Sequence, residues 1–162
     1  MTVRPATPAD LPGILAIYNR IIATSTAIYL SEPTTLEERT AWFEGRRARD
    51  FPVLVSEDED GVSGFSSFGD WRPSPGYRHT VEHTVHIRED RRGQGLGRAL
   101  VQALEPIART LDKHVMLGGI DADNQASLDF HARLGFEPVA HFRQTGRKFD
   151  RWLDLVFVQK LL

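Results

Sequence analysis

Three alternating glycines constrain this chain most, because they stand between a strand-like segment and a helix-like segment. Residues 80–88 before the turn alternate and are rich in β-branched side chains, and residues 96–111 after it place leucine and isoleucine at helical spacing. Glycine lets a backbone turn tightly and approach a ligand, and a helix start favours an anion. Arg92 and Arg98 add positive charge, so the turn predicts a phosphate or pyrophosphate site. The turn comprises Arg91, Arg92, Gly93, Gln94, Gly95, Leu96, Gly97 and Arg98.

Two common phosphate-binding motifs do not match this turn. A P-loop needs lysine and then serine or threonine after its last glycine, but Gly97 is followed by Arg98 and Ala99. The dinucleotide fingerprint starts at Gly93 and Gly95, but arginine occupies its third glycine position. A tight turn without a ligand is the alternative interpretation. It needs fewer glycines, so we favour a phosphate ligand of another kind.

Hydrophobic periodicity predicts an α/β (α+β) fold in which helices flank a mixed central sheet, in a single domain over residues 1–162. Thr7 and Thr35 are predicted N-caps, because each is followed three residues later by an acidic residue. The expected order is β-α-α-β-β-β-α-β-α-β-β, with the last two strands joined around Gly146. The expected helices are 7–22, 35–49, 96–111 and 124–134, and the expected strands after the first are 51–57, 62–71, 80–88, 114–120, 137–144 and 148–160.

Composition excludes several classes of protein and site. The chain has no cysteine, which excludes disulfide frameworks, thiolate metal sites and a cysteine nucleophile. Its net charge of −2 does not suggest binding to nucleic acid or to an anionic membrane. We expect a soluble, cytoplasmic protein, since no signal peptide or membrane span is apparent. We also expect no metal, because His83 and His86 would point to opposite faces of one strand.

The turn and a second motif resemble those of the GNAT N-acetyltransferases. Arg92 to Gly97 match that family's R/Q-x-x-G-x-G/A signature, and a helix that starts at Asn124 ends in Gly135-Phe136, as in the family. The resemblance implies a GNAT fold over nearly the whole chain, with the pyrophosphate of acetyl-CoA bound by residues 92–98. It also implies that Asn124 contacts CoA. From the expected strand and helix we add Ser127 and the backbone N–H groups of Val85, His86 and Ile87, the latter for pantetheine and the thioester carbonyl.

A narrower resemblance concerns the segment from Phe68 to Val85. Its T-V-E-x-[ST]-V run is similar to that of phosphinothricin and methionine sulfone or sulfoximine acetyltransferases. That branch implies a homodimer and acetylation of the α-amine of small amino-acid analogues. The chain has Ser74 where many members have a second arginine after Arg72, which bears on whether phosphinothricin is accepted. It has His131 where many GNAT enzymes have tyrosine.

Glu82 is the predicted general base. Strand alternation puts Thr80, Glu82, Thr84 and His86 on one face, and a polar row on a strand covered on both sides suggests a wet cleft. An edge strand with a solvated face is the alternative. Amine acetylation needs a base to deprotonate the ammonium, and partial burial would raise the pKa of a carboxyl group toward a useful value. A hydrogen-bonded structural glutamate is the other interpretation.

Asn124, Ser127 and His131 share one face of the later helix, because they are spaced at i, i+3 and i+7. His131 could protonate the departing CoA thiolate, or could simply pack beside Phe136. Asn124 could be an N-cap, a CoA contact, or both.

The remaining candidates lie in loops and at element ends. Arg72 and Tyr77 are predicted to bind substrate, unless they belong to a mobile surface loop, and Tyr29 is a weaker pocket candidate. Trp152 is expected in the core or a dimer interface. Arg46, Arg47 and Arg49 are expected to be a solvated helix end.

The sequence therefore predicts direct transfer of acetyl from acetyl-CoA to the primary amine of a small amino-acid-like molecule. Acetylation of a peptide N-terminus, a lysine or a polyamine is the alternative within enzymes. A non-catalytic CoA-binding regulatory module is the alternative outside them.

Overall fold

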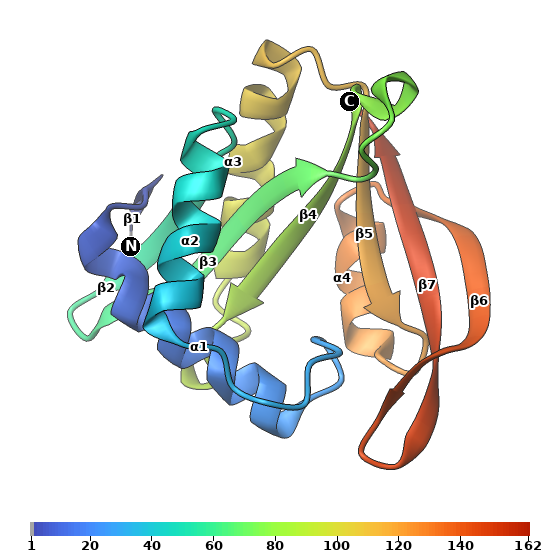
Figure 1. Cartoon of the computed structure of the whole chain (residues 1–162), viewed down its shortest axis with the longest axis horizontal. Coiled ribbons are helices and arrows are strands. Elements are labelled where there is room, and N and C mark those ends of the chain that lie inside the picture. Colours follow the sequence, from blue (N-terminus) through green and yellow to red (C-terminus); the bar gives the residue numbers. More distant parts are fainter. Residues whose placement is uncertain (1) are drawn as a thin grey trace.

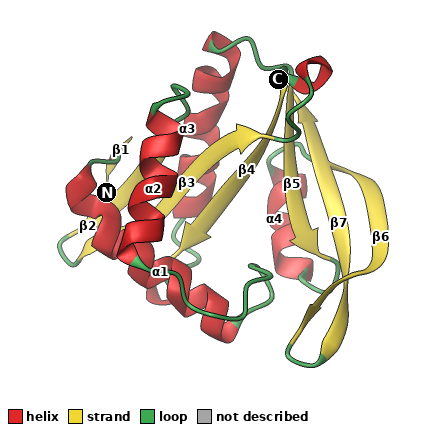
Figure 2. Ribbon diagram, in the orientation of Figure 1, coloured by secondary structure: helices red, strands yellow, loops and turns green. Residues whose placement is uncertain are grey.

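The structure is a computed structural model that describes residues 2–162, and its centre is a seven-stranded sheet (Figures 1 and 2). The spatial order β1-β2-β3-β4-β5-β7-β6 is antiparallel except for the β4–β5 pair, which confirms the predicted mixed sheet and chain order. The strands are β1 Thr2–Pro5, β2 Val53–Asp58, β3 Gly61–Asp70, β4 Thr80–Ile87, β5 Val115–Asp121, β6 Glu137–Lys148 and β7 Arg151–Leu161. The helices are α1 Leu11–Thr24, α2 Leu36–Arg47, α3 Leu96–Thr110 and α4 Gln125–Arg133.

The helices form one layer on each face of the sheet. In Figure 2, α1 and α2 lie in front of the sheet, and α3 and α4 lie behind it. The apolar stripes of α1 and α2 pack on Val55 and Phe65. Leucines of α3 pack on Phe68, Val81 and Met116. The sheet is therefore buried on both faces near its centre, as burial of apolar surface requires.

Local capping explains where the first two helices begin. The Thr35 hydroxyl accepts a hydrogen bond from the Glu38 N–H at 3.2 Å, and the Glu38 carboxylate accepts one from the Thr35 N–H at 2.8 Å. At the other start, the Asp10 carboxylate accepts from the Thr7 N–H at 2.8 Å. This second start opens with a 3₁₀ turn, Pro8–Asp10, before α1. Both predicted N-caps are thus confirmed.

The central strands β4 and β5 separate partway along their length. They pair only from Thr80 and Val115 to Glu82 and Leu117. Beyond Glu82, β4 pairs with β3 alone, and β5 pairs with β7 alone. Figure 1 shows the two strands diverging toward the end of the sheet that carries α1. In the described part of the chain, backbone groups on that side of β4 therefore have no ladder partner.

The predicted turn around Gly146 is wrong. β6 continues through Gly146 to Lys148, and the chain reverses at Phe149 and Asp150, whose φ angles are +51° and +58°. Asp is common in turns that need left-handed backbone at both central residues, but phenylalanine is not, so the local signal for this turn was weak. Gly146 is needed for another reason, because the ring of Tyr29 occupies the space that a side chain there would fill.

Candidate active site

A cavity of about 780 Å³ opens where β4 and β5 diverge. Its walls come from the end of α1, the exposed edge of β4, the glycine-rich turn, β5 and α4. It brings together most of the residues predicted from sequence: Glu82, Val85, His86, Ile87, Arg92, Gly93, Gly95, Leu96, Gly97, Arg98, Asn124, Ser127 and His131. Gln94, Tyr29, Arg72 and Tyr77 are not among the lining residues.

The three glycines of the turn serve different physical purposes. Gly93 and Gly95 have φ angles of +76° and +81°, and within residues 2–162 no atom beyond their immediate chain neighbours lies within 4 Å of where their Cβ atoms would be. They are glycines because of the backbone conformation, and the space around them is open. Gly97 has ordinary φ, but a Cβ there would lie 3.2 Å from the ring of Phe130. It lets α3 approach α4.

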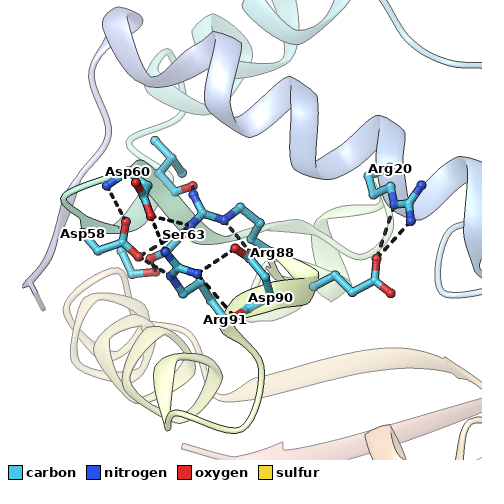
Figure 3. A network of polar contacts seen from close by, with 10 residues as sticks. Arg20, Asp58, Asp60, Ser63, Arg88, Asp90 and Arg91 are labelled. Carbon is cyan, nitrogen blue, oxygen red and sulfur yellow. Dashed lines mark hydrogen bonds and ion pairs between the residues drawn. The ribbon is translucent and has the colours of Figure 1, made fainter.

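Acidic side chains neutralise one arginine of the turn and leave two others available. Figure 3 shows Arg91 held by Asp58, Asp60 and Asp90, with Nε 2.7 Å from Asp58 Oδ2 and Nη1 2.7 Å from Asp90 Oδ2. The ion pairs within residues 2–162 do not include Arg92 or Arg98, and both are exposed. The net positive charge therefore lies at the cavity end of the turn, beside the start of α3, where an anion is favoured.

Glu82 lies at the floor of the cavity. Because β4 is a central strand, the edge-strand interpretation is wrong. The Glu82 carboxylate is half-buried, and burial raises its pKa above the ordinary value of 4.5. Within residues 2–162 it accepts no hydrogen bond, so the geometry gives no support to a structural, hydrogen-bonded glutamate. Gly119 gives it room: a Cβ there would lie 3.2 Å from Glu82 Oε1.

His131 is buried and paired with a second histidine. Its Nδ1 donates to the Ser127 carbonyl at 2.7 Å, and its Nε2 lies 3.1 Å from Nε2 of His83. His83 Nδ1 donates to the Leu117 carbonyl at 2.8 Å. Burial lowers the pKa of both rings, that of His83 to about 3. Since each Nδ1 carries a proton for its carbonyl, the gap between the Nε2 atoms is the place where one further proton would bind.

From the sequence, His83 was considered only as a possible metal ligand, so the contact between His83 and His131 was missed. The available signal was its place in the strand: it faces away from Glu82, toward the side that α4 covers. The group of three or more His, Asp or Glu side chains that a metal ion would need is not found in the described part of the chain.

Asn124 acts as the N-cap of α4, because its side chain accepts a hydrogen bond from the Ser127 N–H at 3.1 Å. The same residue lines the cavity. The capping interpretation is therefore confirmed, and it leaves a CoA contact open.

The loop candidates lie at the outer rim. Tyr29 donates from its hydroxyl to the Asp154 carbonyl at 3.3 Å, which ties its loop to β7. Tyr77 is 40% exposed and packs edge-on against Trp71, and Arg72 stacks on the same indole. Trp71 in turn contacts Phe157 of β7. Tyr29, Arg72 and Tyr77 therefore lie outside the cavity wall.

Comparison of the sequence with models of known protein families identifies the family of this chain. Residues 14–136 match the model of the Acetyltransferase (GNAT) family. This chain belongs to the GNAT acetyltransferase family. GNAT acetyltransferases use acetyl-CoA as the acetyl donor, and the chain is an N-acetyltransferase. The open turn, its two available arginines and the unpaired edge of β4 fit a long, diphosphate-bearing donor.

Known GNAT proteins resemble this chain along nearly its whole length. The L-methionine sulfoximine/L-methionine sulfone acetyltransferase of Pseudomonas aeruginosa is 50% identical, over 98% of this chain and 92% of that protein. A ribosomal-protein-alanine N-acetyltransferase from Brucella melitensis has a TM-score of 0.97 and 44% identity, with full coverage of both chains. A phosphinothricin acetyltransferase from Sinorhizobium meliloti in complex with AcCoA has a TM-score of 0.95 and 32% identity, over 99% of this chain and 88% of that one.

No helix within residues 2–162 of this GNAT protein is long and apolar enough to cross a membrane.

Proposed function

We propose that this GNAT enzyme acetylates the primary amine of a small amino-acid-like substrate of the methionine sulfone, methionine sulfoximine or phosphinothricin type. The observation that carries the proposal is the position of Glu82. Its half-buried carboxylate has no hydrogen-bond partner in residues 2–162 and lines the same cavity as the glycine-rich turn. The relatives named for these substrates support the same class.

Glu82 removes the proton that the substrate brings. The amine arrives as ammonium, whose nitrogen has no lone pair, so it must lose a proton before it can attack the thioester carbon. Glu82 accepts that proton directly or through one water. Backbone N–H groups between Val85 and Ile87 then stabilise the negative charge that develops on the carbonyl oxygen. The chain has no cysteine to carry an acetyl group, so we propose direct transfer in a ternary complex.

His131 is the proposed source of the proton that the departing thiolate takes up. In the structure both of its ring nitrogens are engaged, one by the Ser127 carbonyl and one by His83. Because burial lowers the pKa of both rings, a neutral His131 carries its one proton on Nδ1, and that is the proton we propose it gives to the thiolate, with Nε2 free to take up a replacement. Arg92 to Arg98 hold the diphosphate, with Asn124 and Ser127 on the opposite wall.

The substrate side of the site is proposed to include Tyr29, Arg72 and Tyr77. Tyr77 and Arg72 pack on Trp71, which lies two positions after Gly69, the residue opposite Glu82. Ser74 lies beside Arg72 in the same loop and is our candidate for selectivity against phosphinothricin.

The functional test is CoA release from acetyl-CoA with a panel of amines. The panel holds methionine sulfone, methionine sulfoximine, phosphinothricin, common amino acids, spermidine and a lysine peptide. We expect the sulfone and sulfoximine to be turned over, with phosphinothricin weaker. Silence for all amino acids, with acetyl-CoA still bound, would contradict the proposal and favour the regulatory module.

A second candidate substrate is a peptide N-terminus. The full-length likeness to a structure titled ribosomal-protein-alanine N-acetyltransferase favours it. An N-terminal alanyl peptide added to the panel separates the two candidates, because a peptide lacks the free carboxylate next to its reactive amine.

We also propose a homodimer, built on the outer β6–β7 hairpin. Four large apolar side chains are exposed there: Val139 (50%), Phe142 (45%), Phe149 (56%) and Trp152 (58%). Trp152 is therefore not a core residue, and its interface role stays a prediction. Large apolar side chains exposed on an edge strand and its hairpin partner are a candidate interface. Sedimentation equilibrium should give twice the 18.3 kDa chain mass, and Trp152→Lys should give the monomer.

Since acetyl-CoA is an intracellular donor, the proposal includes a cytoplasmic location.

A further inference from the structure

Two arginines of α2 are partly buried and form no ion pair with any of the residues that the structure describes. The Nε atoms of Arg39 and Arg46 are inaccessible to solvent and have no hydrogen-bond partner within residues 2–162. The expectation that Arg46 belongs to a solvated helix end is therefore wrong, because the helix packs that face onto the sheet. Taking a guanidinium out of water is costly unless an anion or hydrogen-bond acceptor meets it. Two such groups in one place point to a ligand that carries negative charge.

Arg46 lies over the face of the sheet to which Glu82 points. Gly69 of β3 is directly opposite Glu82 in the antiparallel ladder, and opposite residues project to the same face. The guanidinium of Arg46 occupies the space that a side chain at Gly69 would need. Arg46 and Glu82 therefore border the same region above two neighbouring strands.

Arg39 reaches the same face from two helical turns nearer the start of α2. Its guanidinium lies 4.1 Å from the ring centre of Tyr18 and 4.5 Å from that of Trp42. Tyr18 packs edge-on against His86, and both line the cavity. Thr84, between Glu82 and His86 on this face, also lines the cavity and is exposed although its strand is central. The surface between the two arginines and Glu82 is thus accessible.

Within residues 2–162 neither arginine forms an ion pair, although Glu38 and Tyr18 favour the charge of Arg39. Asp70 is the acidic group whose charge acts on Arg46, but it already forms an ion pair with Arg49 and lies 4.0 Å from Lys113. The positive charge of Arg39 also lowers the pKa of Arg46, because two like charges repel. Burial lowers the pKa of both guanidinium groups. A carboxylate between them would relieve the repulsion and supply the missing acceptors.

We infer that Arg39 and Arg46 form the binding site for the carboxylate of the amino-acid substrate. The inference rests on the proposed function and narrows it to amines that carry a carboxylate on the neighbouring carbon. In an α-amino acid the ammonium and the carboxylate share one carbon, so the base and the anion site must border one small space. Glu82 and the α2 arginines do so. Polyamines and peptide N-termini lack this carboxylate.

The test compares two ligands that differ only in the carboxylate: L-methionine sulfone and 3-(methylsulfonyl)propan-1-amine. Their binding to the enzyme loaded with CoA is measured by calorimetry, which requires no catalysis. Hydrogen bonds between charged groups are stronger than neutral ones, so we expect the wild type to prefer the amino acid by at least about 30-fold. Arg46→Gln and Arg39→Gln should each reduce that preference at least about tenfold and leave the amine's affinity unchanged.

Control variants separate recognition from folding. Arg47→Gln is the matched control, because Arg47 is the next residue, is exposed and pairs with Glu44. It should keep the full preference. Arg46→Lys retains the charge and should recover part of the preference, and CoA affinity reports that each variant is folded. Equal weakening of both ligands would assign the arginines a structural role and overturn the inference.

Two other results would also overturn it. One is a wild-type enzyme that does not distinguish the two ligands, and the other is loss of the preference in Arg72→Gln alone, which would move the carboxylate to the rim. The proposed function fails separately. If the amino acid binds with this preference but is never acetylated, the anion site stands and the reaction assignment does not.

Discussion

Glu82→Gln is expected to lower kcat/KM for the amine by about 10²- to 10⁴-fold, the usual contribution of a general base. Glutamine has the same shape but cannot accept the ammonium proton. The carboxylate must be ionised to act, and burial raises its pKa above 4.5. Activity of the wild type should therefore rise with pH through that raised pKa, and the variant should lose this dependence. Steady-state kinetics across pH measure both effects.

The same substitution should not harm binding of acetyl-CoA or folding. A raised folded-state pKa means that the folded protein binds the Glu82 proton more tightly than the unfolded chain does. The wild type therefore loses stability as pH rises from about 4.5 through that pKa, and the variant does not. At neutral pH the variant should be at least as stable as the wild type. A variant with more than about a tenth of wild-type activity would assign the base to another group.

His131→Gln separates the acid from the base. If His131 supplies the thiolate proton, its loss lowers kcat but preserves the rise of activity through the pKa of Glu82. The effect should be smaller with an acetyl thioester whose thiol is more acidic, because that thiolate leaves without a proton. Loss of activity that is independent of the leaving thiol would instead indicate that the His83 contact serves packing.

Lys148→Met is expected to have the largest effect on stability, a loss of about 3 kcal/mol in the free energy of unfolding. Lys148 is buried, and its Nζ donates at 2.7 Å to each of the carbonyls of Ile22, Ser25 and Ile28. Methionine fills similar volume but leaves three carbonyls without this donor. Denaturant titration followed by tryptophan fluorescence measures the loss.

The loop that Lys148 holds also borders the active site. Ser25 and Ile28 line the cavity, and Tyr29 follows them. The variant should therefore raise KM for the amine more than it weakens CoA binding. Arg147→Met is the matched control, because Arg147 is the preceding residue of β6 and its side chain is half exposed. It should unfold within about 0.5 kcal/mol of the wild type. A Lys148→Met protein as stable as its control would show that the three hydrogen bonds of Lys148 do not stabilise the fold.

Features that depend on neighbouring residues in the chain could be predicted from sequence. The capping boxes at Thr7 and Thr35, the N-cap at Asn124 and the glycine-rich turn all use contacts within a few residues. The face of Glu82 followed from strand alternation alone. The family signature added the donor, because its residues lie within a single turn.

Features that depend on distant segments were missed or wrong. Gly146 resembled a turn in sequence, but it is a strand residue that accommodates Tyr29, more than a hundred positions earlier. Arg46 was predicted to lie at a solvated helix end, but its guanidinium packs over Gly69 of β3. The His83–His131 contact joins β4 to α4 across 48 positions. Such pairings leave no periodic or local pattern.

The sequence by itself therefore determined the order of helices and strands, the glycine-rich turn between strand and helix, and the family, and it singled out Glu82 as the candidate base. Each of these follows from backbone preference, side-chain alternation or a contiguous motif. The tertiary structure alone decided that β4 and β5 separate after Glu82, which opens the cavity, and that α2 lays two unpaired arginines on the same face. Strand separation and helix docking are set by packing between segments far apart in the chain, so their chemical consequences exist only in the folded protein.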